Sequence, residues 1–450
     1  MNNARDETLE ACRAMARQQL LRGDRDAAER SFLSLLQRHP QDVEALRFVA
    51  DCQSARGEHV AAMQGLQAVT RLAPEDPAAW VQLAATQMAA DDIRGAIASF
   101  GHGLALAPRM FVPRLQLGIA LEQLGQTHDA LKAYFMAIES AHGMGRWQDD
   151  ATTAPGLRDA VKHAVDYVNR ERRALFRRAL DPLRERYGGS QLARVERSLA
   201  IYFLDLPANI PDTRQRPKFL YFPDITSQPY YPRHHFPWLE ALEAATDSVR
   251  DELRAVLSEE RALESFLGEA PADAMQDMLG SSGDQEPAWD AYFFHRHGER
   301  HDAHRAQCPR TAALLDALPL VRIRDHAPEA LFSVLSPGTH ILPHTGVTNT
   351  RLVTHLPLIV PPDCAIRVGG QEHAWQEGRC VTFDDTWEHE AWNRSGQRRV
   401  VLIVDSWHPD LSEVERAAVT DLVEAIGDFN QSCKLPDPPM QAGRSSTMSA

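Results

Sequence analysis

Two histidines and an arginine lie within one short segment, PHTGVTNTRLVTHLPL, at residues 343–358. His344 follows a proline, Arg351 begins a predicted strand, and His355 lies inside that strand. Imidazole nitrogens bind transition metals, and a guanidinium binds carboxylates through two parallel hydrogen bonds. A buried strand would normally carry β-branched or other apolar side chains at such positions. The segment therefore predicts either a metal and anion site or a polar edge strand.

A further histidine and arginine, His389 and Arg399, lie in the later segments VTFDDTWEHEAW and RRVVLIVDSW. Because His344 and His389 are far apart in the chain, they can meet only if strands fold back on one another, as in a jelly roll. Arg399 would then point into the same barrel mouth, where a buried positive charge is costly unless an anion pairs with it. A carboxylate cosubstrate is the natural partner of such a guanidinium.

The elements that must position these residues are short strands. After residue 330 the chain divides into apolar segments separated by turn residues, which are ALFSVL, RLVTHLPLIV, CAIRVGG, GRCVTFDD and RRVVLIVDSW. Segments of this length and even spacing predict an all-β sandwich or barrel. Upstream, KFLYFPDI at residues 218–225 predicts a further strand, and residues 239–267 predict a helix.

Three longer segments resemble a known family. They are PGTHILPHTGVTNTRL, WQEGRCVTFDDTWEHEAWNRS and RRVVLIVDSWHP, in this order, with CPRT and FPWLEALE upstream. Over residues 216–425 the sequence is similar to the aspartyl/asparaginyl β-hydroxylase family of Fe(II)- and 2-oxoglutarate-dependent oxygenases. The resemblance implies a double-stranded β-helix core, of the jelly-roll or cupin-like kind, that uses Fe(II), 2-oxoglutarate and O2.

The resemblance also implies roles for individual residues. His344 and His389 fall where the family places its two iron-binding histidines. Arg399 falls at the arginine that pairs with the distal carboxylate of 2-oxoglutarate, and Ser333 at a serine that hydrogen-bonds the same carboxylate. His355 matches a histidine beside the cosubstrate.

Two positions depart from the pattern. Gly346 stands where the wider oxygenase class carries a carboxylate ligand, which this family omits, and Asp385 is then expected to hold a water on the metal. Arg351 matches the first arginine of the family's R-L-R stretch, which faces the substrate carboxylate; the alternative is a surface ion pair. Val353 replaces the second arginine, and this loss of positive charge weakens the case for an aspartyl substrate.

The other polar residues near these motifs are expected to be structural. His340 and His408 are assigned as satisfied histidines of the fold. Asp384, Glu388 and Glu390 are expected to cap, to pair or to face water.

The N-terminal third repeats with a period of 34 residues. The period appears in four columns of residues: Ala28, Ala62, Ala96 and Ala130; Phe32, Leu66, Phe100 and Tyr134; Gly23, Gly57, Asp91 and Gly125; Pro40, Pro74 and Pro108. Small residues let two helices approach, the larger side chain one turn later fills the groove, and the glycine column suits the turn. The pattern over about residues 10–142 resembles the tetratricopeptide repeat, which implies a surface for protein or peptide; the alternative is a dimerisation or spacer element.

These patterns predict an α+β multidomain chain. Residues 1–145 would form the repeat array, 146–215 a helical connector, 216–425 the oxygenase domain, and 426–450 a disordered tail. Residues 207–217, at the end of the connector, predict a linker. The basic stretch NRERRALFRRALDPLRER predicts a solvated helix face interrupted by Pro182, with nucleic-acid binding as the lesser alternative.

Composition narrows the class of protein. The net charge of −14, from 48 basic and 62 acidic residues, argues against nucleic acid as a partner. The N-terminal sequence does not have the pattern of a secretory signal, and no apolar run is long enough to predict a membrane span. The six cysteines are scattered, which predicts reduced thiols, a cytoplasmic location and no thiolate zinc site.

The sequence as a whole predicts a dioxygenase that hydroxylates an unactivated carbon. The favoured substrate is the β-carbon of an Asp- or Asn-type residue in a protein or peptide recruited by the repeats. One alternative is a hydroxylase of a small molecule or a lipid acyl chain. Another is a non-catalytic repeat scaffold or sensor with a metal-binding barrel.

Overall fold

The computed structural model describes residues 2–259, 263–268, 278–281 and 286–436. Its contacts divide the chain into two compact units. Unit 1 comprises the residues up to Leu175 together with those from Phe429 onward, and unit 2 comprises Phe176–Asp428. The chain passes from unit 1 to unit 2 within helix α9 (Arg158–Ala179) and returns within helix α17 (Glu413–Ser432).

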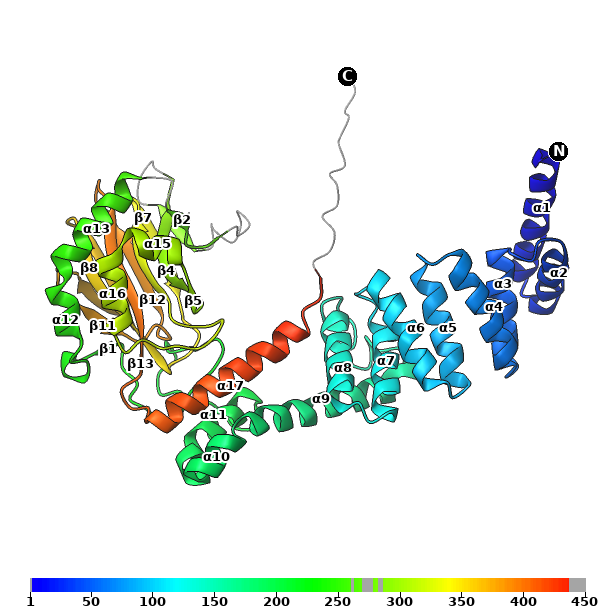
Figure 1. The fold of residues 1–450 in the computed structure, drawn as a ribbon, viewed down its shortest axis with the longest axis horizontal. Helices are drawn as coiled ribbons and strands as arrows, with labels where there is room; N and C mark the ends of the chain where they lie inside the picture. The colour runs from blue at the N-terminus through cyan, green and yellow to red at the C-terminus, as the bar shows by residue number, and fades with distance from the viewer. Residues whose placement is uncertain (1, 260–262, 269–277, 282–285, 437–450) are drawn as a thin grey trace, which may run out of the picture. The chain divides into compact units, whose positions relative to one another are not determined.

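In unit 1, helices α1 to α8 each pack against the next one along the chain (Figure 1). They are α1 (Asn2–Leu21), α2 (Arg25–Arg38), α3 (Val43–Ala55), α4 (His59–Leu72), α5 (Pro77–Ala89), α6 (Ile93–Leu106), α7 (Phe111–Gln123) and α8 (Thr127–His142). The even-numbered helices begin every 34 residues, so the predicted repeat is the repeat of helix pairs. The predicted helical-repeat fold is therefore confirmed.

The residue columns found in the sequence form the core of these pairs. The alanines have no exposed surface, and neither do Leu66, Phe100 and Tyr134 one turn later. The helices approach closely at Gly118 of α7, where an added Cβ would lie 2.5 Å from the Tyr134 ring of α8. The backbone at Asp91 has φ of +61°, in the left-handed region that the equivalent glycines of the other turns adopt more easily.

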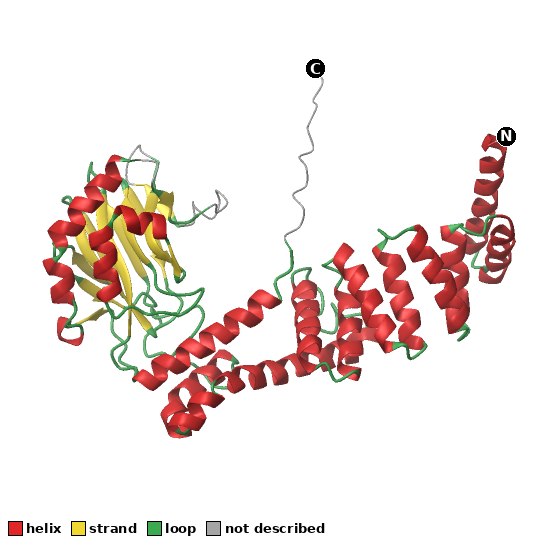
Figure 2. Cartoon of the chain, in the orientation of Figure 1, coloured by secondary structure: helices red, strands yellow, loops and turns green. Residues whose placement is uncertain are grey.

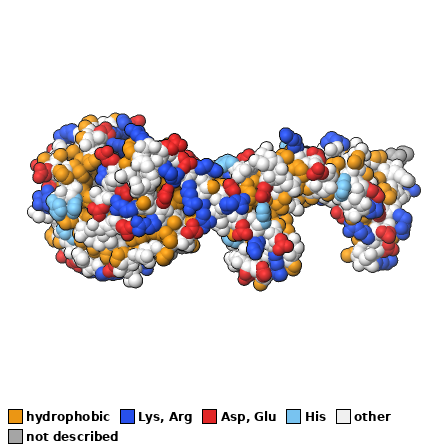
Figure 3. Space-filling model, turned by 90° about the horizontal axis from the view of Figure 1, so that it is seen from below, with side chains coloured by type: hydrophobic (Ala, Val, Ile, Leu, Met, Phe, Trp, Pro, Cys, Tyr) orange, Lys and Arg blue, Asp and Glu red, His pale blue; other side chains and the backbone are white. Residues whose placement is uncertain are grey.

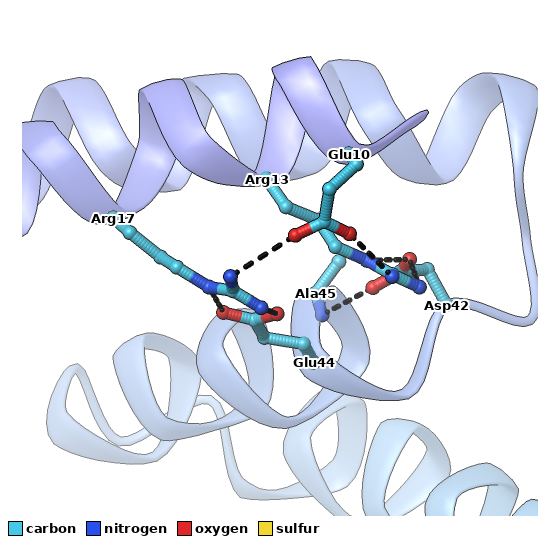
Figure 4. Close-up of polar contacts among 6 residues, drawn as sticks. All are labelled: Glu10, Arg13, Arg17, Asp42, Glu44 and Ala45. Carbon is cyan, nitrogen blue, oxygen red and sulfur yellow. Dashed lines mark hydrogen bonds and ion pairs between the residues drawn. The ribbon is translucent and has the colours of Figure 1, made fainter. Parts of the chain in front are cut away.

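Ion pairs join α1 to α3 at the surface (Figure 4). Arg13 lies 2.7 Å from the Asp42 carboxylate, which also caps the start of α3. Arg17 donates to both carboxylate oxygens of Glu44, at 2.7 and 2.6 Å. Glu10 accepts from Arg13 and from Arg17 at 3.1 Å each, so every charge in this group has a partner.

After α8 the chain continues through η1 (Pro155–Leu157), α9, α10 (Asp181–Tyr187), η2 (Gly189–Leu192) and α11 (Ala193–Tyr202). The predicted interruption at Pro182 is confirmed, because α9 ends at Ala179 and Pro182 lies in the first turn of α10, where its missing N–H costs nothing.

The surface charge is mixed. On the face drawn in Figure 3, acidic side chains lie among the basic ones.

Helix α17 corrects the predicted start of the tail. Residues 426–432 were assigned to a disordered tail, but they form the last turns of this helix. The reason is apolar burial, since Ile426 and Phe429 are both buried. The rest of the predicted tail from residue 437 lies outside the described residues. No helix in the described part of the chain combines the length and apolarity needed to cross a bilayer.

Unit 2 contains two antiparallel sheets (Figure 2). The larger has the strand order β1-β11-β8-β13-β6-β4-β2, with β5 paired to β4, and the smaller has the order β10-β9-β12-β7-β3. The strands are β1 (Tyr230–Tyr231), β2 (Glu264–Ser265), β3 (Leu279–Ser281), β4 (Trp289–Arg296), β5 (Glu299–Arg300), β6 (Ala330–Leu335), β7 (Thr339–His344), β8 (Arg351–Ile359), β9 (Cys364–Val368), β10 (Gln371–Ala374), β11 (Val381–Phe383), β12 (His389–Asn393) and β13 (Arg399–Trp407). The predicted double-stranded β-helix fold is confirmed.

Helices cover one face of the larger sheet (Figure 1). They are α12 (Leu239–Ala244), α13 (Thr246–Ser258), α15 (Asp302–Gln307) and α16 (Pro309–Ala317), with the short η3 (Arg233–His235) before them. Leu253 of α13 and Leu315 of α16 share one buried cluster with Leu356 of β8. The other face of the larger sheet meets the smaller sheet in a second cluster, which contains Val401 and Ile366. The site must therefore lie between the sheets, because helices fill the opposite side.

Three local predictions need correction. Residues 218–225 form no strand beyond an isolated bridge from Leu220 to Thr348. The single helix predicted over residues 239–267 is instead divided into α12 and α13, and α13 ends at Ser258. Residues 264–265 form a strand that pairs with β4, and residues 260–262 lie outside the described part. The predicted linker ends in ordered structure, because Gln215 is buried and its amide donates to Asp384 at 2.9 Å.

Candidate active site

A cavity of about 180 Å³ lies between the two sheets of unit 2. All seven predicted site residues line it, and they are Ser333, His344, Arg351, His355, Asp385, His389 and Arg399. Apolar and aromatic side chains complete the wall, including Trp289, Ile341, Ile366 and Phe383. The structure thus brings together residues that are dispersed over more than sixty positions of the sequence, while the roles assigned to them stay predictions.

The histidine pair sits where two strands of the smaller sheet meet. His344 ends β7, His389 begins β12, and these two residues are register partners. Their ring centroids lie 4.1 Å apart. The His344 Nδ1 lies 2.8 Å from the Leu342 carbonyl and the His389 Nδ1 lies 2.9 Å from the Trp387 carbonyl, so both Nδ1 atoms must carry the proton. Each Nε2 then keeps a lone pair, which is the form in which imidazole binds a metal.

Desolvation keeps the two rings neutral. Burial lowers the pKa of His389 to about 3, and it also lowers the pKa of His344. Neutral imidazoles with a fixed tautomer need no proton loss before they bind a metal ion. The pair therefore fits the predicted iron ligands in type, tautomer and proximity.

Asp385 fills the space beside Gly346, the position at which the wider oxygenase class carries a carboxylate as its third metal ligand. A Cβ at Gly346 would lie 2.2 Å from the Asp385 carboxylate, so no larger residue fits there without moving it. The Asp385 Oδ1 atom is buried and has no partner in the structure. Desolvation raises the pKa of Asp385 to about 7, against the attraction of Arg351. No three His, Cys, Asp or Glu side chains of the described residues form a ready metal site.

Arg399 is a buried cation that pairs with no carboxylate among the described residues. Its side chain begins β13, it is 2% exposed, and its Nε has no partner. The guanidinium lies 4.8 Å from the centre of the Trp375 ring, and its one polar contact given by the structure is the Ser333 carbonyl, at 3.5 Å. Burial lowers the pKa of Arg399 to about 10, which still leaves it charged at neutral pH. An unpaired buried charge of this kind fits a carboxylate ligand.

Two further residues lie on the same side of the cavity. The Ser333 hydroxyl accepts a hydrogen bond from the Trp289 indole at 3.0 Å, so its own proton is free to donate to an anion. The His355 Nδ1 is buried without a partner, and burial followed by the charge of Arg399 lowers its pKa well below the ordinary value. These two residues thus fit the predicted 2-oxoglutarate contacts.

Arg351 already has a partner. It lies 2.6 Å from the Asp405 carboxylate, with side chains that are 15% and 2% exposed. The sequence left open whether Arg351 faces substrate or forms a surface pair; it forms a pair, but a largely buried one at the cavity wall. The cavity also contains Glu329, and neither carboxylate was predicted as a site residue. Asp405 had a signal in the sequence, as the one charge in the apolar run VVLIVDSW, whereas Glu329 had none.

The residues assigned to structural roles lie outside the cavity. His340 pairs with Glu390 at 2.7 Å, and Arg216 pairs with Glu388 at 2.6 Å. His408 is fully buried and lies 2.9 Å from the Tyr231 hydroxyl, and the Asp384 carboxylate accepts from the Thr386 N–H. These assignments are confirmed.

Comparison with known proteins agrees with this geometry. Residues 243–409 match the family described as "Aspartyl/Asparaginyl beta-hydroxylase", and residues 19–86 match "Tetratricopeptide repeat". The C-terminal half of the chain thus carries an aspartyl/asparaginyl β-hydroxylase domain, preceded by tetratricopeptide repeats. Members of this hydroxylase family are Fe(II)- and 2-oxoglutarate-dependent oxygenases.

Curated relatives that match the hydroxylase domain have names that refer to different substrates. Over 40% of this chain, the sequence is 34% identical to human aspartyl/asparaginyl beta-hydroxylase. Over 47% of this chain, it is 33% identical to rat aspartate beta-hydroxylase domain-containing protein 2. It is 35% identical to ornithine lipid ester-linked acyl 2-hydroxylase of Rhizobium tropici over 42%. The match covers 22%, 60% and 64% of these relatives, which is less than two thirds of each. Among solved structures, the chain is similar to MamA protein at 20% identity, over 40% of this chain and 96% of that chain, with a TM-score of 0.29.

Proposed function

We propose that the hydroxylase domain binds Fe(II) through His344 and His389 and 2-oxoglutarate through Arg399, and hydroxylates an unactivated carbon with O2. The observation that carries the proposal is the unpaired, buried Arg399 guanidinium in the same cavity as two neutral histidines. A cation and two free imidazole nitrogens enclosed together are costly in an empty fold and useful for an anion that also binds a metal.

The bound iron would supply O2 activation, with 2-oxoglutarate consumed as succinate and CO2. The residues of the chain would position and shield. Arg399 and the Ser333 hydroxyl would hold the distal carboxylate of 2-oxoglutarate, with His355 beside it. The Asp385 carboxylate, whose Oδ1 lacks a partner, would accept a hydrogen bond from a water on the metal. The aromatic wall would exclude other water from the reaction.

For the substrate we propose an Asp- or Asn-type residue of a protein or peptide that the repeats recruit. The presence of tetratricopeptide repeats in the same chain favours a polypeptide. A lipid acyl chain is the second candidate, because the Rhizobium tropici relative is named for acyl hydroxylation. The two candidates differ in the product, which gains one oxygen atom either on a peptide or on an acyl chain.

The first test measures Fe(II) and 2-oxoglutarate binding without oxygen, then O2-dependent succinate formation, in wild type and His389→Ala. Succinate formed by wild type and lost in the variant supports the oxygenase. Tight binding without succinate means that the true substrate must trigger turnover, and a screen of peptides and lipids for the mass of one added oxygen follows. Binding of neither ligand contradicts the proposal and leaves a repeat scaffold.

A further inference from the structure

The cavity contains one carboxylate that the metal and cosubstrate residues do not use. Glu329 precedes β6 and lines the cavity together with His344 and Arg399. One of its oxygens accepts the backbone N–H of His297 at 2.8 Å and also lies 2.8 Å from the Nδ1 of that histidine. The other oxygen, Oε2, is buried and has no hydrogen-bond partner in the structure. A buried acceptor in this condition is satisfied only when a donor reaches it.

The positive charge on the same wall, that of Arg351, already has an ion-pair partner. Arg351 pairs with Asp405 at 2.6 Å, and the same Asp405 oxygen accepts the backbone N–H of Glu329 at 3.0 Å. This pair of contacts fixes Glu329 beside the Arg351–Asp405 ion pair. Val353, two residues after Arg351, contributes a buried apolar side chain to the cavity.

The wall formed by Glu329, Arg351 and Asp405 therefore carries two carboxylates and one guanidinium. A substrate carboxylate at this wall would meet a guanidinium that is already paired with Asp405, and would face the unpaired oxygen of Glu329. A carboxamide suits the wall better, because its N–H₂ group can donate to Glu329 and its carbonyl can accept from Arg351, whose Nε also lacks a partner. A site that leaves a buried polar group unpaired with the wrong substrate discriminates strongly.

We propose that Glu329 is a specificity-determining residue that excludes substrate carboxylates and accepts a hydrogen bond from an uncharged carboxamide. The inference rests on the proposed function, because it places the substrate group beside the metal and cosubstrate residues. The proposal narrows the substrate class from Asp- or Asn-type residues to residues that carry a hydrogen-bond donor next to the reacting carbon, as the carboxamide of Asn does.

The test uses the full chain with Mn(II) in place of iron and saturating N-oxalylglycine, an unreactive analogue of 2-oxoglutarate. Paramagnetic relaxation of the methyl protons of acetamide and of acetate reports which probe enters the cavity. In wild type we expect acetamide to be relaxed about tenfold more than acetate at equal concentration. Glu329→Gln keeps the size of the side chain and removes its charge, and it should raise the acetate signal until the two probes are about equal.

The control is Glu372→Gln, the same replacement at an exposed carboxylate of β10 that pairs with Arg367. It should leave the preference unchanged. Equal relaxation of the probes in wild type, relaxation of neither, or a preference that Glu329→Gln does not alter would overturn this inference alone. Absence of Mn(II) binding would instead defeat the proposed function on which it rests.

Discussion

Buried side-chain atoms without a hydrogen-bond partner are distributed differently in the repeat unit and in the hydroxylase unit. Among the described residues of unit 1, buried side-chain atoms without a hydrogen-bond partner occur singly, for example on Arg47, His59 and Arg114 of three different helices. In unit 2, eleven described residues carry such atoms, and five of them line one cavity: Glu329, Arg351, His355, Asp385 and Arg399. Each buried group left unsatisfied costs about 1–3 kcal/mol.

The contrast separates residues that hold the fold from residues that await a ligand. In unit 1 the buried residues of the repeat columns pack against one another, and surface charges such as Arg17 and Glu44 pair with each other. In unit 2 the same chain tolerates unpaired charge between two well-packed sheets. Replacements in the cavity should therefore affect activity far more than stability, and replacements in the repeats should do the reverse.

The largest effect is expected for His344→Ala. Loss of groups that only orient metal ligands typically costs about 10–100-fold in activity, so loss of a ligand should cost at least about a hundredfold. Succinate formation and the free energy of unfolding would be measured on the same samples, and stability should change little. His340→Ala is the matched control on the same strand, since His340 pairs with Glu390 outside the cavity. Equal loss of activity in both variants would contradict the assignment.

Arg399→Met should separate activity from stability most clearly. Removing a charged hydrogen-bond donor costs about 1.5–3 kcal/mol, which corresponds to a rise of about ten- to a hundredfold in the KM for 2-oxoglutarate. The free energy of unfolding without ligand should stay equal or rise, because the variant removes an unpaired buried charge and keeps an apolar side chain. A large loss of stability would show that Arg399 holds the fold rather than a ligand.

His408 provides a polar contact of unit 2 that is fully satisfied, and its replacement should change the pH dependence of stability. The Asp410 N–H donates to its Nδ1 at 3.1 Å, which requires the neutral ring, and burial lowers its pKa to about 4. Between the ordinary pKa of 6.5 and about 4, the unfolded chain binds a proton that the folded chain does not. The contribution of the neutral His408 to the free energy of unfolding is therefore complete above pH 6.5. It decreases as the pH falls toward 4, by at most about 3 kcal/mol.

Denaturant unfolding of wild type and His408→Gln across this pH range tests the sign. The wild type should lose stability more steeply toward low pH than the variant. His234→Gln, at an exposed position, serves as the control and should follow the wild type. Parallel curves for wild type and His408→Gln would show that His408 does not contribute.

The comparison also explains what the sequence revealed. The repeat array was predictable because its period recurs, so each column supports the others, down to Asp91 in the place of a glycine. The cavity residues were predictable from three motifs of a known family. Strand β4, which pairs with β6 and lies next to the edge strand β2 of the larger sheet, was missed because WDAYFFHR lies apart from those motifs.

Contacts between distant segments stayed beyond the sequence. Gln215 looked like part of a linker because its surroundings are polar and rich in proline, and only its buried bond to Asp384 shows that the segment is part of the barrel. Glu329 gave no signal for the same reason, since its meaning comes from its place beside Arg351 and Asp405. Local patterns predict elements, whereas such tertiary partners follow from the folded arrangement.

The smallest expected effects are in unit 1 and have opposite signs at two glycines. In Gly118→Ala the new methyl group would lie 2.5 Å from the ring of Tyr134, which is fully buried and whose hydroxyl donates to Glu122 at 2.7 Å. The ring cannot move freely, so the clash, about 1–3 kcal/mol, should outweigh the gain of about 1 kcal/mol in helix propensity. Gly101→Ala in α6 meets nothing within 4 Å and should stabilise by about 0.5–1 kcal/mol. Thermal unfolding measures the change in stability of both variants. Succinate formation without a recruited polypeptide substrate should remain at the wild-type rate in both. A change in that rate would mean that packing in the repeats affects catalysis in the cavity. Stability and catalysis would then not be divided between the two units.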